Sequence, residues 1–143
     1  MAFNSMYFHS LDAKNRIFIP AKFRDELGDD IIIAPSLRNK CLVVYSIKEW
    51  EKYISPIKEG LTREELEKVM RYLNGRALRL FLDSTGRVQL TPELVAYAGL
   101  NDKQISIIGC GDYAEIWNAD TYNDVMNSTS NDDILKILNR FGL

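Results

Sequence analysis

The chain carries the stretch LDAKNRI at residues 11–17 and the stretch LDSTGRV at residues 82–88, and these two stretches decide the predicted fold. They share the pattern leucine, aspartate, three variable residues, arginine and an apolar residue, and the second begins 71 positions after the first. Aspartate favours turns, and in each copy it lies at the junction of two apolar runs. We therefore expect each copy to form a β-hairpin whose loop presents an arginine.

The residues around each copy predict the same order of elements. The first copy predicts a strand, a turn, a returning strand and a short helix at residues 7–11, 12–15, 16–19 and 20–28. The second copy predicts the same series at residues 77–82, 83–86, 87–90 and 92–99. Proline suits the first turn of each helix and glycine suits its end. The match indicates a duplicated unit, so we expect a single domain over residues 1–143, built from pseudo-equivalent repeats at 5–54 and 77–123.

Two further helices lie outside the duplicated series. Thr62 and Glu65 form a capping box, which predicts a helical connector over residues 62–75. Its apolar residues recur at helical spacing, which favours burial in the core over an interface. They are Leu66, Val69, Met70 and Leu73. A last helix is predicted over residues 131–141, and the sequence leaves open whether it packs on its own subunit or on a neighbour.

Charge is distributed unevenly along the chain. The net charge of −2 argues against a simple basic nucleic-acid binder. Residues 1–90 carry 15 Lys and Arg against 12 Asp and Glu, whereas residues 91–143 carry 3 against 8. A basic surface formed by the duplicated stretches is therefore compatible with an acidic total.

Composition also limits the class of protein. With 46% hydrophobic residues, 143 residues are enough to bury a core. The chain has no basic and apolar leader and no apolar run long enough to cross a membrane, so we expect a soluble cytoplasmic protein without a membrane partner. Cys41 and Cys110 have no Cys or His at ligand spacing, which predicts small buried thiols and neither a disulfide nor a metal site.

The sequence offers little support for an enzyme. Its one histidine, His9, alternates with apolar residues in a predicted strand, which favours a structural or surface role over catalysis. No glycine-rich phosphate-binding loop is present, and residues 109–112 predict a hairpin turn. We assign no catalytic residue, and we expect no cofactor, metal or small-molecule substrate.

Each Asp-x-x-x-Arg pair has two interpretations. In the structural one, the aspartate caps its own turn and the arginine forms a salt bridge back to it. The duplication favours the second, in which two arginines form a spaced cationic pair that binds phosphate or a guanine edge in the major groove. The DNA-binding candidates are Arg16, Arg87 and Lys14. The candidates that orient the loops are Asp12, Asp83, Asn15 and Gly86.

These motifs resemble the MraZ family, a bacterial family of transcriptional regulators related to the AbrB/SpoVT swapped-hairpin fold. The segments that carry the resemblance are residues 12–24, 83–90 and 97–100. The resemblance implies an α+β, mostly β fold: a double-split β-barrel from two internal repeats with short helices. It further implies homo-oligomeric rings, association with the nucleoid, and binding through both loops to repeated boxes in double-stranded promoter DNA, at genes for division and cell-wall synthesis.

The chain departs from the family pattern at three positions. Asn15 replaces the usual glycine, Thr91 is inserted before Pro92, and Val95 stands where a basic residue is common. Asparagine tolerates positive φ, so we expect the first turn to survive. The missing basic residue predicts weaker or more salt-sensitive binding. A scaffold ring that does not bind DNA, and a small enzyme with a site between subunits, remain the alternatives.

Overall fold

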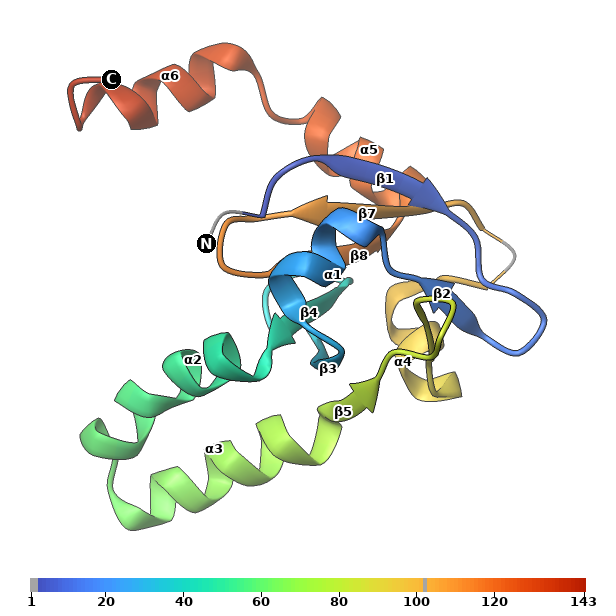
Figure 1. Ribbon diagram of the computed structural model, residues 1–143. Coiled ribbons are helices and arrows are strands. Elements are labelled where there is room, and N and C mark those ends of the chain that lie inside the picture. The colour runs from blue at the N-terminus through green and yellow to red at the C-terminus, as the bar shows by residue number, and fades with distance from the viewer. Residues whose placement is uncertain (1–2, 102) are drawn as a thin grey trace.

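The computed structural model describes residues 3–101 and 103–143 (Figure 1). Within these ranges the chain forms eight strands and six helices. In chain order they are β1 (Met6–His9), β2 (Arg16–Phe18), α1 (Ala21–Leu27), β3 (Asp30–Pro35), β4 (Leu42–Ser46), α2 (Ile47–Gly60), α3 (Arg63–Arg76), β5 (Leu78–Phe81), β6 (Arg87–Gln89), α4 (Pro92–Ala98), β7 (Ile105–Gly109), β8 (Ala114–Asn118), α5 (Ala119–Asn127) and α6 (Asn131–Asn139).

The strands form two antiparallel sheets, which confirms the α+β class. The larger has six strands in the order β1-β7-β8-β4-β3-β5, and the smaller pairs β2 with β6. Over the described residues both sheets are open, and no single closed barrel is formed. The double-split barrel therefore stays a prediction.

The two predicted hairpins are wrong in their strand pairing. Strand β1 pairs with β7 and strand β5 pairs with β3, while β2 and β6 pair with each other. The turns form as expected, but the strands on either side of each turn diverge to partners elsewhere in the chain. This pairing brings the buried Ile17 and Val88 face to face across the β2–β6 ribbon, so both halves contribute to one core.

The main core lies between the six-stranded sheet, the ribbon and the helices α1 and α4. Phe23 and Leu27 of α1 are buried four residues apart, on one face of the helix. Leu94 and Val95 of α4 are also buried, and Val95 is 1% exposed. A basic side chain at position 95 would not lie on the surface of this fold, so weaker DNA binding no longer follows from the valine.

Capping residues begin the helices α2 and α3. The Ser46 hydroxyl accepts the Glu49 N–H at the start of α2, and Thr62 and Glu65 cap α3 reciprocally. The expectation that the α3 stripe is buried is wrong: no residue of α3 is buried, and Met70 and Leu73 are only partly covered by a second cluster under α2. An amphipathic pattern identifies an apolar face but does not say what covers it.

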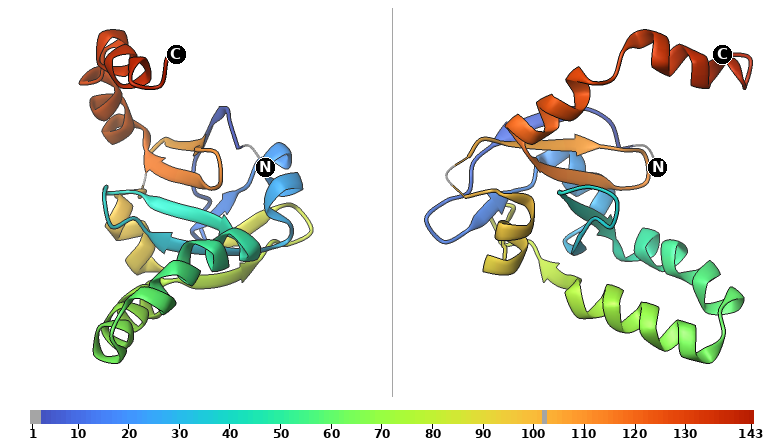
Figure 2. Two further views of the ribbon diagram at one scale, coloured as in Figure 1. Left: turned by 90° about the vertical axis from the view of Figure 1, so that its left-hand side faces the viewer. Right: turned by 180° about the vertical axis from the view of Figure 1, so that it is seen from behind.

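The C-terminal helix α6 ends at Asn139 rather than at residue 141. It projects away from the sheet and from the α2–α3 pair in every view (Figure 2). In the part of the chain that the structure describes, no helix is long and apolar enough to cross a membrane.

The structure also describes the two cysteines and the turn at residues 109–112. Cys41 is buried and Cys110 is half-buried, both are free thiols, and burial raises the pKa of each to about 12. The segment Gly109–Asp112 turns between β7 and β8, which form the predicted hairpin.

Candidate nucleic-acid interface

The β2–β6 ribbon presents its charged side chains on one face. Arg16 lies opposite Gln89, Ile17 opposite Val88, and Phe18 opposite Arg87. Side chains alternate along a strand, and the central pair faces the core, so the other four point outward together. Arg16 and Arg87 are diagonal neighbours, a relation that separates Cα atoms by roughly 7–8 Å. The two arginines that the sequence singled out thus share one outward face.

The two Asp-x-x-x-Arg loops lie at opposite ends of this ribbon and are fixed by matching backbone hydrogen bonds. The Leu90 N–H donates to the Asn15 carbonyl, and the Ile19 N–H donates to the Gly86 carbonyl, each at 2.9 Å. Each loop is therefore anchored by the strand that belongs to the other half of the chain.

In the first loop the aspartate holds both backbone and side chain. Asp12 Oδ1 accepts the N–H groups of Lys14 and Arg16 at 2.9 Å, and its Oδ2 accepts Arg16 Nε at 2.6 Å. The Arg16 N–H is the largest cause that lowers the pKa of Asp12. The Arg16 side chain is 40% exposed, so it is ion-paired and still reachable. Asn15 takes positive φ, 58°, as expected for this turn.

In the second loop the aspartate side chain is hydrogen-bonded to a threonine and not to the arginine side chain. Asp83 Oδ1 accepts three hydrogen bonds. Two come from Thr85, from its N–H at 2.9 Å and from its hydroxyl at 2.7 Å, and the third comes from the N–H of Arg87 at 2.9 Å. The Arg87 N–H is the largest cause that lowers the pKa of Asp83. The Arg87 guanidinium donates instead to the Thr85 hydroxyl at 3.1 Å. Among the described residues it forms no salt bridge.

A third arginine, Arg24 of α1, joins this face, and the sequence reasoning missed it. Its guanidinium carbon lies 5.3 Å from the centre of the Phe18 ring, and that of Arg87 lies 5.9 Å from the same ring. Arg24 Nε is buried without a hydrogen-bond partner in the described part of the chain. The signal available was its place beside Phe23, just off the apolar face of a short helix.

Gly86 is required where the second loop meets Arg24. Its φ is +82°, and a Cβ added there would lie 2.6 Å from Arg24 Nη1. Glycine thus satisfies both the turn and the close approach of the guanidinium.

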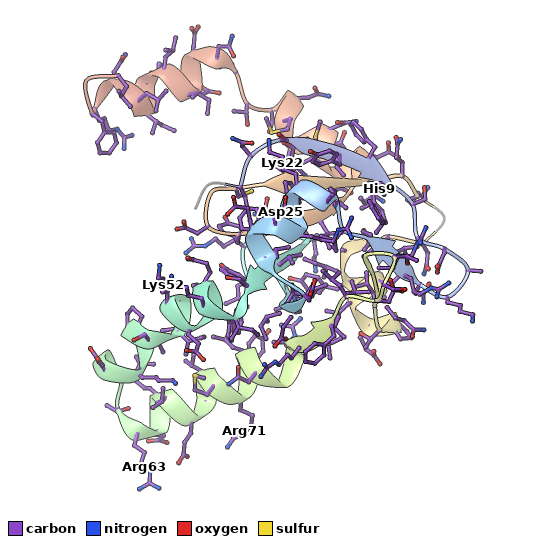
Figure 3. All side chains as sticks on the ribbon, viewed as in Figure 1. His9, Lys22, Asp25, Lys52, Arg63 and Arg71 are labelled. Carbon is purple, nitrogen blue, oxygen red and sulfur yellow. The ribbon has the colours of Figure 1, made fainter. Side chains whose placement is uncertain are left out.

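Two further candidates lie at the edge of the arginine cluster. The Lys14 side chain is exposed at the tip of the first loop, and the Lys14 carbonyl accepts Gln89 Nε2 at 3.0 Å. His9 of β1 lies with its ring 5.3 Å from that of Phe18 (Figure 3). Burial, followed by the charge of Arg87, lowers the pKa of His9. Near neutral pH its imidazole is therefore uncharged, and the positive charge of this face comes from Arg16, Arg24, Arg87 and Lys14.

The chain matches a family model described as "MraZ protein, putative antitoxin-like" over residues 2–71 and 74–140. The chain belongs to the MraZ family. All seven candidate residues lie inside the matched segments.

Relatives named Transcriptional regulator MraZ match nearly the whole chain. The protein of Alkaliphilus metalliredigens is 36% identical and covers 96% of this chain and of its own length. That of Paenarthrobacter aurescens is 38% identical over 82% of this chain and 81% of the relative. That of Lachnoclostridium phytofermentans is 34% identical over 99% and 98%. The MraZ resemblance stated from the sequence motifs is confirmed.

Proposed function

We propose that this chain is a sequence-specific, DNA-binding transcriptional regulator that acts as a homo-oligomer on repeated promoter boxes, at genes for division and cell-wall synthesis. The observation that carries the proposal is the shared outward face of the ribbon, where Arg16 and Arg87 are diagonal neighbours and Arg24 shares the Phe18 ring with Arg87. The names of its MraZ relatives support a role in transcription.

The proposed mechanism uses the arginine fork and the rigidity of the loops. A two-stranded ribbon fits the major groove, and a guanidinium donates two parallel hydrogen bonds to a phosphate or to guanine O6 and N7. Asp12 and Asp83 fix the loop backbones, so less conformational freedom is lost when the arginines bind. Lys14 and Arg24 add attraction to the phosphate backbone.

Specificity in this proposal comes from several subunits. One ribbon offers few base contacts, so adjacent subunits on repeated boxes gain affinity through linked binding. We further propose that residues 1–143 form one domain of two pseudo-equivalent repeats, 5–54 and 77–123, and that the sheets correspond to the double-split barrel of the family. The proposed place of action is the cytoplasm, on the nucleoid, without catalysis.

The test is a fluorescence-anisotropy titration with labelled DNA from upstream of the chain's own gene, repeated across salt concentrations. We expect Arg16→Ala and Arg87→Ala each to weaken binding by about 5- to 150-fold, the range for losing one specific arginine contact. Oligomer size and melting temperature should stay near those of the wild type.

Matched controls come from α3, where the labelled side chains of Arg63 and Arg71 point away from the rest of the molecule (Figure 3). Arg63→Ala and Arg71→Ala remove the same charge and should leave affinity nearly unchanged. The proposal fails if the controls weaken binding as much as the ribbon variants do. It also fails if the ribbon variants unfold the chain, because their arginines would then be structural.

A further inference from the structure

Helix α6 is an amphipathic helix whose apolar face has no packing partner among the described residues of its own chain. Every residue from 123 to 143 is exposed, including Phe141 at 75% and Leu135 at 51%. A nine-residue helix is marginal in water unless one face is packed against something. The structure nevertheless gives it a defined start, because Ser130 and Asp133 form a reciprocal capping box.

The apolar side chains of α6 and of the turn that follows it form one stripe. Ile134 and Leu138 lie four residues apart on one face of α6, and Phe141, two residues beyond the end of the helix, continues that spacing. Leu135 and Ile137 widen the stripe on either side. Exposed apolar side chains gathered on one face are typical of an interaction site.

A hollow lined by aromatic side chains lies on the outer face of the six-stranded sheet, and we call it the aromatic trough. Its volume is about 620 Å³, and β4, α2, α3 and the turns after β3 and β7 line it. Its aromatic residues are Tyr45, Trp50, Tyr53, Tyr72 and Tyr113. Tyr45 stacks between Tyr53 and Tyr113, with ring centres 5.6 and 5.3 Å apart. Tyrosine, tryptophan and arginine are the residues that dominate protein–protein binding energy.

The charges of the trough complement those of α6. Arg38 and Arg76 line it, and neither forms a salt bridge with any described residue. The first turn of α6 carries Asp132 and Asp133.

The other charged groups of the trough are compatible with a docked α6 whose first turn lies near Arg38 and Arg76. Lys52 pairs with Glu49, and Glu115 accepts the indole N–H of Trp117, so these groups are already engaged. Asp112 also lines the trough. Lys136 near the end of α6 and Arg140 directly after the helix supply positive charge that complements Asp112.

We propose that α6 of one copy docks in the aromatic trough of a second copy. This rests on the self-association in the proposed function and names the surfaces that form it. The α6 helix of the same chain is carried away from α2 and α3 in all three ribbon views, so its trough is left for a neighbour (Figures 1 and 2). The donor helix and the acceptor trough are different surfaces of one chain, and such head-to-tail contacts close into rings or extend into chains.

The first test breaks each surface separately and measures mass by size-exclusion chromatography with light scattering. Leu138→Asp on α6 should convert the wild-type oligomer to monomer, and so should the double variant Tyr53→Ala, Tyr72→Ala in the trough. Both tyrosines are exposed, at 42% and 56%, so their removal should leave melting temperature near that of the wild type. The controls Asn139→Asp on α6 and Phe81→Ala on β5, outside the trough, should stay oligomeric.

The second test mixes the two monomeric variants. The trough of Leu138→Asp is intact and so is the helix of the tyrosine variant, so only one interface can form. An equimolar mixture should therefore give heterodimers and nothing larger. Docking in the same chain is the true arrangement if Leu138→Asp alters tryptophan fluorescence equally at all concentrations without changing mass. The proposal is overturned by that result, by an oligomeric Leu138→Asp variant, or by a mixture that stays monomeric.

The outcome is separable from that of DNA recognition. Leu138→Asp should retain weak binding to a fragment with one box and lose the gain that repeated boxes provide. Arg16→Ala and Arg87→Ala should lose DNA and keep the wild-type mass. Failure of either proposal therefore leaves a different pattern in the two assays.

Discussion

In the loop at residues 12–15 the aspartate holds the side chain of its arginine, whereas in the loop at residues 83–86 it holds a threonine. Both aspartates accept the N–H of the arginine four residues later at 2.9 Å, so the backbone turn is the same. The side chains differ: Arg16 is ion-paired to Asp12, and Arg87 leans on Thr85 and Phe18.

The aspartate of the motif therefore has two separate roles, to shape the loop backbone and to pair with the arginine side chain. The aspartate is needed in both loops to shape the backbone, while the ion pair is specific to the first. Solvent weakens a partly exposed ion pair, so Arg16 can exchange its carboxylate for a phosphate at small cost. Arg87 has no carboxylate to leave, but it depends on the Thr85 hydroxyl and the Phe18 ring for its position.

The largest expected effect breaks the second loop alone. Gly86→Ala forces a Cβ onto a residue with φ of +82° and against Arg24 Nη1 at 2.6 Å. We expect the free energy of unfolding to fall by about 1–3 kcal/mol, measured by urea denaturation. Asn15→Gly, the matched change at the first loop, should cost far less because glycine also tolerates positive φ.

A double variant tests the cause of this loss. Gly86→Ala combined with Arg24→Ala removes the steric contact and keeps the backbone strain. It should be less destabilised than the sum of the two single variants. Simple additivity would show that Arg24 does not press on the loop.

The next effect concerns the Phe18 ring, which Arg87 contacts together with Arg24. Phe18→Ala should weaken DNA binding by about 0.5–1 kcal/mol, because Arg24 and Arg87 lose the aromatic face they share. In double-mutant cycles its effect should be coupled to that of Arg87→Ala and additive with that of Arg16→Ala. Equal coupling to both arginines would contradict the difference between the loops.

A smaller effect concerns the position that is lysine in one loop and threonine in the other. Lys14→Thr should lower the slope of log affinity against log salt by about 1, the effect of losing one phosphate contact. Thr85→Lys removes the hydroxyl that holds Arg87 and adds a charge, so it should raise the slope. Anisotropy titrations across salt concentrations measure both. An unchanged slope in Lys14→Thr would place Lys14 outside the interface.

The smallest effect is the contribution of the two aspartates to stability, which is lost in acid. The pKa values of Asp12 and Asp83 are lowered from 3.8 in the folded chain, chiefly by backbone N–H groups. The unfolded chain therefore binds protons more readily, and the stabilisation is complete above pH 3.8 and lost as the pH falls through the lowered folded-state values. Asp12→Asn and Asp83→Asn should differ from the wild type in urea denaturation at pH 5, and less so at pH 3. Asp132→Asn, on the exposed α6, is the control for general loss of charge.

Local signals in the sequence predicted most of the helices and turns. Pro92 and Gly99 bound α4, and Thr62 with Glu65 begins α3, because caps and breakers act through neighbouring residues alone. The positive φ of Asn15 followed from the tolerance of asparagine for that region.

Long-range features could not be predicted in the same way. Strands of three residues carry no register signal, so the pairing of β2 with β6 was not visible, and two separate hairpins were the simpler hypothesis. Once that pairing is known, the alternation in Arg16–Phe18 and Arg87–Gln89 places both arginines outward. Arg24 was missed because only tertiary packing brings α1 against Gly86. The predicted DNA contacts themselves stay a prediction.

The β2–β6 ribbon has a consequence for the growing polypeptide on the ribosome. A nascent chain that has reached only residue 80 has already made Arg16 but has not yet made β6. Its first loop lacks the Leu90 donor that anchors the Asn15 carbonyl in the finished protein. A fragment cut between α3 and β6 should be equally incomplete, so only a chain that extends through β6 and Leu90 can display the two arginines on one ribbon.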